Sequence, residues 1–260
     1  MNNQELHLRV RQELDRVEQE RDVRVLFACE SGSRAWGFAS RDSDYDVRFL
    51  YVHQRDWYLS VDDRRDVIER PMSDELDVSG WELRKALRLL RKSNPPLLEW
   101  LKSPTVYRYD PVFAAEFGAL ATDFYSPKRC FSHYLHMAFG NWRHYLEGRA
   151  QVSLKKYLYV FRPVLACRWL ERRLGQAPML FSRLVEGVLE EREVRGALDE
   201  LVERKQAGEE LAVAPPVETL SRFLETELNR LDTVEKPEDM HGETEALDAF
   251  FRRYALAGWN

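Results

Sequence analysis

Hydrophobic residues follow a helical spacing at the start of the chain and then gather in short runs. Apolar residues three or four positions apart, among charged neighbours, predict an amphipathic helix over 4–20 through Leu6, Val10, Leu14 and Val17. Segments 23–29 (VRVLFAC) and 45–52 (YDVRFLYV) are rich in β-branched and aromatic side chains, and we expect both to be buried strands. Two more short strands are predicted over 66–71 and 75–79. From Gly80 the spacing is helical again, until Asn94-Pro95-Pro96 ends the helix because proline lacks an amide donor.

The remainder of the chain shows helical spacing alone. Beyond about Pro111 we expect helices over 111–124, 127–148, 153–174, 191–206, 217–231 and 243–256. The change of hydrophobic period near 103–111 divides the chain into two predicted domains, 1–108 and 109–260. The predicted fold class is therefore α+β: a small mixed sheet with helices, followed by an all-helical domain.

Composition narrows the class of protein. The 260 residues are 44% apolar and 32% charged, which excludes collagen, low-complexity disorder and a disulfide-stapled miniprotein. No run approaches the roughly 18 apolar residues of a membrane span, and the first twenty residues lack the apolar core of a signal peptide. The cysteines are few and far apart, at Cys29, Cys130 and Cys167. We expect them to be reduced core thiols of a cytoplasmic protein.

The net charge of −5 hides an uneven distribution. Residues 127–175 carry ten basic and two acidic side chains, whereas residues 176–260 carry ten basic and nineteen acidic ones. A solvated helix face is the ordinary explanation of such a basic segment, but it can also receive an anionic ligand.

A small group of residues between the first two predicted strands is the candidate for phosphate and metal binding. Gly32-Ser33 forms a turn after strand 23–29, and its backbone N–H groups can surround phosphate oxygens. Asp44 and Asp46 flank one residue at the start of the next strand, so both carboxylates point to the same face. Such a pair suits Mg²⁺, which binds one or two carboxylates together with substrate phosphates. Asp77, alone among apolar residues of a short strand, is our candidate for a third ligand, with Glu75 and Asp74 as alternatives better suited to a turn.

Several neighbours have two explanations each. Arg34 either reaches a phosphate with its forked guanidinium or is an exposed loop charge. Trp36 and Phe38 are expected to pack beneath the loop, with stacking of Trp36 on a nucleotide base as the less favoured alternative, and Asp42 is expected to cap or solvate the loop. On the predicted helix 127–148, His133 and His136 are expected to pack among aromatic side chains, with a general-base role as the less favoured alternative. A zinc site is not expected, because no third ligand lies at a suitable spacing.

These residues resemble a known signature. Gly32-Ser33, then Asp44-Tyr45-Asp46, then Asp77 is similar to the pattern of the DNA polymerase β-like nucleotidyltransferase superfamily. More narrowly, the three segments that resemble the RlaP (RNA-ligase-associated) family are GSRAWGFASRDSDYDVRFLYV, NPPLLEWLKSPTVY and KKYLYVFRPVLACRWLE. The resemblance covers residues from about 23 to 175.

The resemblance implies an activity and roles for these residues. Asp44, Asp46 and Asp77 would hold two Mg²⁺ ions, which Mn²⁺ can replace, and Asp77 would also help to activate an attacking hydroxyl. Gly32 and Ser33 would hold the β and γ phosphates of a nucleoside triphosphate, for which we expect ATP. The reaction would move a nucleoside monophosphate to an acceptor hydroxyl and release pyrophosphate.

The basic segment offers further candidates for nucleotide binding. Lys155, Tyr159 and Arg162 are spaced i, i+4, i+7, so they lie along one face of helix 153–174. The resemblance implies a triphosphate-binding lysine in the helical domain, either Lys155 or Lys156. A solvated basic edge is the alternative explanation of this face.

The acceptor stays open at this stage. The RlaP resemblance implies a function associated with RNA ligation or repair, with an RNA end as the acceptor. The same chemistry on a protein hydroxyl, a small molecule or a second nucleotide is one alternative. A non-catalytic nucleotide sensor is another, although a binder has no need of three carboxylates around a phosphate.

Overall fold

The computed structural model describes residues 3–72, 75–208, 213–237 and 243–257. The chain forms two compact units, each built from separated segments. The first, here called the sheet unit, comprises Met1–Gly32, Asp44–Tyr125 and Met240–Asn260. The second, the helical unit, comprises Ser33–Ser43 and Ser126–Asp239. The α+β fold class is confirmed. The predicted domain boundary at residue 108 does not coincide with a boundary of these compact units, because each unit is built from separated segments.

The sheet unit contains a five-stranded mixed sheet in the order β3-β4-β2-β1-β5. Its strands are β1 (Val23–Glu30), β2 (Tyr45–His53), β3 (Val67–Glu69), β4 (Leu76–Glu82) and β5 (Val106–Tyr109). Strands β2 and β4 run parallel, and the other neighbouring pairs are antiparallel. The helices of this unit are α1 (Asn3–Arg21), α3 (Arg55–Tyr58), α4 (Leu83–Arg91), α5 (Pro95–Trp100), α6 (Pro111–Asp123) and α12 (Thr244–Leu256), and α2 (Gly32–Trp36) leads out of it.

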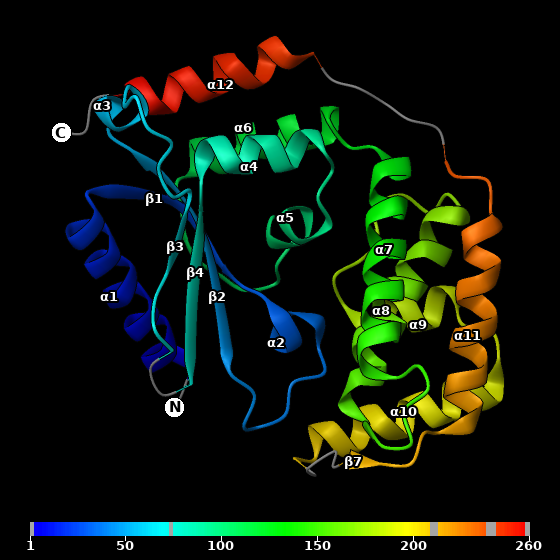
Figure 1. Cartoon of the computed structure of the whole chain (residues 1–260). Helices are drawn as coiled ribbons and strands as arrows, with labels where there is room; N and C mark the ends of the chain where they lie inside the picture. Colours follow the sequence, from blue (N-terminus) through cyan, green and yellow to red (C-terminus); the bar gives the residue numbers. More distant parts are fainter. Residues whose placement is uncertain (1–2, 73–74, 209–212, 238–242, 258–260) are drawn as a thin grey trace. The chain divides into compact units, whose positions relative to one another are not determined.

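Two apolar layers cover the sheet. The hydrophobic stripe of α1, predicted from the sequence, packs on one face against side chains such as Val47, Phe49 and Val78. Helices α4, α6 and α12 contact β1, β2 and β4 in a separate layer. Figure 1 shows α12, in red, beside α4 and α6, and Phe250 of α12 lies 5.7 Å from the Phe113 ring of α6. Because side chains alternate along a strand, the even-numbered residues of β2 face away from α1.

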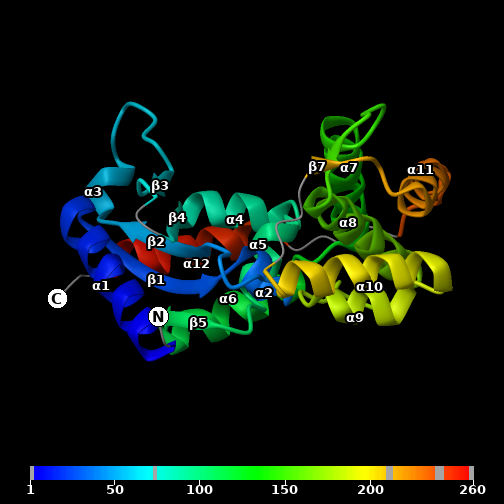
Figure 2. The same cartoon turned by 90° about the horizontal axis from the view of Figure 1, so that it is seen from below.

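Helix α8 is the centre of the helical unit. Its elements are α7 (Pro127–Tyr145), α8 (Lys155–Glu171), α9 (Phe181–Val188), α10 (Arg192–Gln206) and α11 (Glu218–Thr233), with short strands β6 (Val152–Ser153) and β7 (Val213–Ala214). Most side chains of α8 are buried. Helices α7 and α8 lie side by side in both Figure 1 and Figure 2.

The structure corrects several boundaries. The helix predicted from Gly80 begins at Leu83, because β4 continues to Glu82, whose carboxylate then caps α4 by accepting from the Lys85 amide at 3.1 Å. Pro95 ends one helix and begins the next, since Asn94 caps α5 and proline is tolerated in the first turn. The region after Pro111 is not wholly helical, because β6 and β7 pair there. Within the described ranges, no helix has both the length and the apolar character needed to cross a bilayer.

Candidate active site

Asp46 and Asp77 lie side by side in the sheet unit. They are direct register partners on the parallel strands β2 and β4, so both carboxylates project from the face opposite α1. The Arg48 guanidinium joins them: its Nη2 lies 2.9 Å from Asp46 Oδ1 and 2.7 Å from Asp77 Oδ2. The side chains of Asp46 and Asp77 are 26% and 32% exposed, so the group is open to a ligand. The fold thus brings together two of the three predicted carboxylates, although 31 positions separate them in the sequence.

Asp44 lies one residue before β2 and is exposed. The backbone next to Asp44 is fixed by strand pairing, because the Tyr45 amide donates to the Glu75 carbonyl at 2.7 Å. Glu75, an alternative third ligand, is exposed in the turn before β4, and Asp74 is outside the described residues.

Gly32 sits directly against Asp46. Its φ of +58° belongs to the left-handed region, which glycine adopts without the steric cost of a side chain. A Cβ at this position would lie 1.9 Å from Asp46 Oδ2, a distance that no side chain can occupy. The neighbouring Ser31 amide donates to the Asp46 carbonyl at 2.8 Å. Glycine is therefore required here for two reasons, the backbone conformation and the close approach of the carboxylate.

Glu30 is a functional candidate that the sequence reasoning missed. It is 3% exposed at the end of β1, and its Oε1 accepts the Asp46 amide at 2.8 Å. Its other carboxylate oxygen accepts the Tyr107 hydroxyl, and Ser103 Oγ donates to its carbonyl at 2.6 Å. The position of Asp46 is thus fixed by side chains from β1 and β5. The signal available in the sequence was a single acidic residue at the end of an apolar strand, two positions before Gly32.

The segment after Gly32 belongs to the helical unit. Ser33 is buried and its carbonyl accepts the Phe38 amide at 3.1 Å. The Arg34 guanidinium donates to the Ser43 carbonyl, which ties the two ends of the segment 33–43 together. Arg34 therefore has a structural task in this loop besides any contact with a phosphate.

The predicted face of α8 meets this segment. The Trp36 ring lies 6.1 Å from the Tyr159 ring, and the Arg162 guanidinium lies 4.6 Å from the Trp36 ring. Trp36 therefore packs as expected. Lys156 lies over the rings of Tyr145 and Tyr159, at 4.1 and 5.0 Å.

The four predicted nucleotide-binding residues of α8 differ in accessibility. Lys155 is exposed, whereas Lys156 and Tyr159 are partly buried. Arg162 is only 4% exposed and donates to the Met179 carbonyl at 3.3 Å. As placed, Lys155 and Lys156 are more accessible to a phosphate than Arg162, and all four assignments remain predictions.

The histidines of α7 are not packed as expected. His133 and His136 are both exposed, and the His136 ring is hydrogen-bonded to the Ser132 carbonyl of the preceding turn at 2.7 Å. The helix turns its Phe131, Tyr134 and Leu135 side chains inward and leaves these two outside. The prediction of aromatic packing was wrong because i, i+3 spacing does not say which face is buried.

Asp46 and Asp77 are the two predicted metal ligands that the fold brings together. Over the described ranges, no group of three or more His, Cys, Asp or Glu side chains is arranged to hold a metal ion. The Arg48 guanidinium nevertheless shows that a cation can contact both carboxylates, and oxygen donors of this kind suit Mg²⁺. The two carboxylates fit a divalent ion, with Asp44 close in sequence as a further donor.

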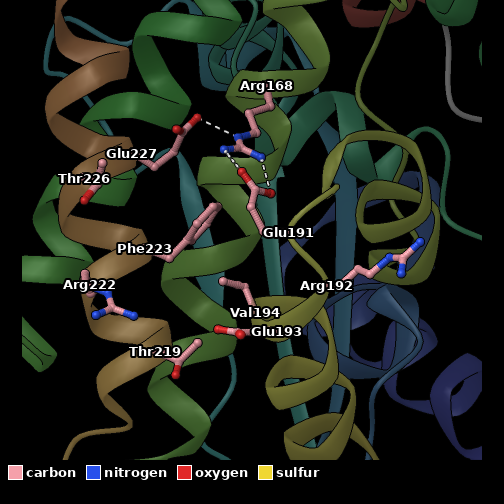
Figure 3. Close-up of a pocket in the computed structure, with 10 residues that line it drawn as sticks. All are labelled: Arg168, Glu191, Arg192, Glu193, Val194, Thr219, Arg222, Phe223, Thr226 and Glu227. Carbon is pink, nitrogen blue, oxygen red and sulfur yellow. Dashed lines mark hydrogen bonds and ion pairs between the residues drawn. The ribbon is translucent and has the colours of Figure 1, made fainter.

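A separate cavity of about 500 Å³ lies in the helical unit between α8, α10 and α11. Figure 3 shows Arg168 at one end of it, between Glu227 and Glu191, with Phe223 below. Arg168 Nε lies 2.6 Å from Glu227 Oε1, and its Nη2 lies 2.8 Å from Glu191 Oε1. The Arg168 charge is thus already compensated. None of the predicted site residues lines this cavity.

Comparison with known proteins identifies the family of the chain. The family described as "RlaP: RNA repair pathway DNA polymerase beta family" matches residues 6–253. A Bacillus subtilis (strain 168) protein, described as uncharacterized protein YcgL, is 45% identical over 248 residues, which are 95% of this chain and 94% of the relative. A solved nucleotidyltransferase-like protein from Exiguobacterium sibiricum aligns with 12% identity and a TM-score of 0.33, over 94% of this chain and 77% of that chain.

Proposed function

The chain belongs to the RlaP family, the RNA repair pathway DNA polymerase β family, and from that premise we propose that it is a Mg²⁺-dependent nucleotidyltransferase acting on an RNA end. The observation that carries the proposal is the pairing of Asp46 with Asp77 across two parallel strands, with the Gly32 turn pressed against Asp46. The proposed reaction moves a nucleoside monophosphate from a nucleoside triphosphate, ATP, to an acceptor hydroxyl.

Two Mg²⁺ ions, or Mn²⁺, would be held by Asp44, Asp46 and Asp77. When bound, the metal would stabilise the attacking and leaving oxygens of an in-line displacement. The Arg48 guanidinium now contacts one oxygen of each carboxylate of Asp46 and Asp77, and the metal would replace it there. Glu30, which accepts the Asp46 amide, would keep β2 in place during this exchange.

The chain's own residues supply the positioning and the proton transfer. Gly32, Ser33 and Arg34 would bind the β and γ phosphates through backbone N–H groups, a hydroxyl and a guanidinium. Lys155 and Lys156 would bind the same phosphates, and Tyr159 and Arg162 would support the two lysines from the same helix. Asp77 would orient the acceptor hydroxyl and accept its proton. The acceptor oxygen bonds to the α-phosphorus, the bond from that phosphorus to the bridging oxygen breaks, and pyrophosphate leaves.

We place the reaction in the cytoplasm. Cys29, Cys130 and Cys167 are buried thiols, which suits a compartment that keeps thiols reduced. Burial raises the pKa of the Cys29 and Cys167 thiols, so neither is poised to act as a nucleophile.

The test is transfer of label from α-labelled nucleoside triphosphates, each supplied separately with Mg²⁺ or Mn²⁺. RNA with free ends, protein and small hydroxyl compounds are offered as separate acceptors. Label on RNA supports the proposal, and γ-labelled nucleotide should then release its label only as pyrophosphate. Label on protein or small molecules alone would contradict the RNA acceptor. Tight nucleotide binding without transfer to any acceptor would contradict the enzyme and favour a sensor.

A further inference from the structure

Helix α7 of the helical unit has a continuous outer face without a negative charge. Arg129, His133, His136, Gly140 and Arg143 follow one another at intervals of four, three, four and three residues, so they lie along one face of the helix. Arg129 is partly exposed, and the other four are exposed. None of the 19 residues of α7 is acidic. At 1.5 Å per residue, the face from Arg129 to Arg143 is about 21 Å long.

The arginine at the end of this face has a charge that the fold does not neutralise. In the part of the chain that the structure describes, Arg143 has no ion pair with a carboxylate. Its guanidinium lies 5.3 Å from the centre of the Phe139 ring, one turn earlier on the same helix, and Phe139 is partly exposed. Basic side chains beside aromatic rings are typical of sites for single-stranded nucleic acid, where they contact phosphates and bases.

Gly140 lies on this face between His136 and Arg143. Among the described residues, no atom outside the helix's own backbone lies within 4 Å of the position that a Cβ would take. Packing therefore does not require glycine here, although glycine in a helix interior weakens the helix relative to alanine. The missing side chain leaves the backbone of α7 open to a closely approaching ligand.

His136 presents a hydrogen-bond acceptor on the same face. Its Nδ1 donates to the Ser132 carbonyl at 2.7 Å, because a carbonyl oxygen can only accept. In the neutral ring this leaves Nε2 as an acceptor, and the side chain is exposed. A ribose 2′-hydroxyl can donate to such an acceptor, whereas deoxyribose has no hydroxyl at that position.

We propose that this face of α7, from Arg129 to Arg143, binds the sugar-phosphate backbone of single-stranded RNA. The inference rests on the proposed function for the role of that RNA, which is the acceptor. Arg143 binds a phosphate, and Phe139 contacts a base. Gly140 lets the strand approach the helix, and His136 accepts a hydrogen bond from a 2′-hydroxyl. Because most of these contacts are to phosphate and sugar, binding depends little on base sequence.

Fluorescence anisotropy of a labelled single-stranded RNA, titrated with the protein without nucleotide or metal, tests this surface. Arg143→Met should weaken binding on the order of tenfold, the loss expected for one charge-assisted contact. The slope of log K against log salt should become shallower by about 0.7. The matched control is Arg183→Met, which removes an exposed arginine of α9 in the same unit. Absence of RNA binding by the wild type, or equal binding by Arg143→Met and Arg183→Met, would overturn the proposal.

Gly140→Leu separates RNA binding from the stability of the helix. Leucine is a better helix former than glycine, so the variant should unfold at the same or a higher temperature than the wild type. Its side chain should nevertheless hold RNA away from the helix and weaken binding. Gly196→Leu, at an exposed glycine of α10 with equally open surroundings, is the control. RNA binding that is as tight in Gly140→Leu as in Gly196→Leu would contradict the close approach to α7.

The kind of ligand is tested with DNA of the same sequence and with polyglutamate. The wild type should bind RNA more tightly than DNA, and His136→Ala should reduce this preference. Equal affinity of the wild type for RNA and DNA would overturn the assignment to RNA. Polyglutamate that binds as tightly as RNA, and is weakened by Arg143→Met, would assign the face to an acidic protein instead.

The transfer assay on the same variants separates this inference from the proposed function. Together, the two proposals predict that Arg143→Met and Gly140→Leu raise the KM for RNA. Label transfer to RNA with an unchanged KM in both variants would refute the surface alone. RNA binding that depends on Arg143, with no transfer to any acceptor, would refute the enzyme alone.

Discussion

Asp46 and Asp77 face each other as register partners on neighbouring parallel strands, and one guanidinium, that of Arg48, contacts both carboxylates. Two carboxylates so close repel each other when the cation between them is removed. The sheet unit thus carries its own substitute for a metal cation at the position where we propose that the metal binds.

Arg48→Met should destabilise the metal-free protein and make its stability depend on Mg²⁺. Since the three side chains are partly exposed, we expect a loss of about 1 kcal/mol, or about 2–4 °C in Tm. Millimolar Mg²⁺ should raise the Tm of this variant more than that of the wild type, as thermal unfolding monitored by circular dichroism would measure. Arg65→Met, which removes an exposed ion pair with Glu69, is the control. An equal Mg²⁺ response in wild type and Arg48→Met would contradict a shared site.

Asp46→Asn or Asp77→Asn should abolish nucleotidyl transfer while leaving the fold intact. Each replacement removes a proposed metal ligand and leaves Arg48 with the other carboxylate, so activity should fall by about 100-fold or more. Pyrophosphate release with α-labelled nucleotide measures the change. Asp42→Asn, in the loop before β2, should retain wild-type activity, and normal activity in Asp44→Asn and Asp46→Asn together would refute the metal site.

Gly32→Ala should disturb the site through Asp46. The added methyl group would meet Asp46 Oδ2, and alanine at a φ of +58° costs about 1–2 kcal/mol by itself. Urea unfolding and transfer activity should both decline. Gly118→Ala, in α6 with open space around it, should instead stabilise the protein by about 0.5–1 kcal/mol. If Gly32→Ala is as stable and active as wild type, the close approach of Gly32 to Asp46 contributes neither to stability nor to activity.

Glu227→Gln should destabilise the helical unit by about 3 kcal/mol, because it leaves the buried Arg168 without its closest partner. Burial would raise the pKa of Glu227, but hydrogen bonds from Arg168 and Arg230 outweigh burial and lower the pKa below 4.5. A carboxyl with a lowered pKa contributes stability at neutral pH, and that contribution is lost as pH falls through the folded-state pKa.

The difference in unfolding free energy between wild type and Glu227→Gln should therefore be largest at pH 7 and shrink below pH 4.5. Urea unfolding at several pH values measures this difference. Glu225→Gln, an exposed neighbour on α11, should show no such dependence. A difference that is constant from pH 7 to pH 3 would exclude ionisation of Glu227 as its source.

Local patterns predicted the fold where one face of an element is buried. The stripe of α1 and the strands β1 and β2 follow directly from hydrophobic spacing. Strand β5 was missed because it is four residues long with both ends exposed. The start of α4 was misplaced because Trp81 fits both a helical spacing and the alternation of β4, whose Gly80 leaves room for the Phe49 ring.

The residues of the candidate site also differ in whether local sequence or long-range contacts identify them. Gly32, Asp44 and Asp46 are recognisable because they are close in sequence and their chemistry is typical. Glu30 could not be recognised as a contact, since it depends on a partner brought near only by the tertiary fold. Arg48 was visible as an arginine within β2, but the shared contact with Asp77 depends on the register of β4.

Helix α12 determines when the sheet unit is complete during synthesis. Leu247, Phe250 and Tyr254 of α12 are buried, and the Tyr254 hydroxyl donates to Glu116 of α6 at 2.8 Å. The chain is made from its N-terminus, and units generally fold as they emerge from the ribosome. The helical unit ends at residue 239, whereas α12, which covers the sheet, is made after it. A nascent chain therefore carries Asp46 and Asp77 long before it carries the helix that completes the second apolar layer on their sheet.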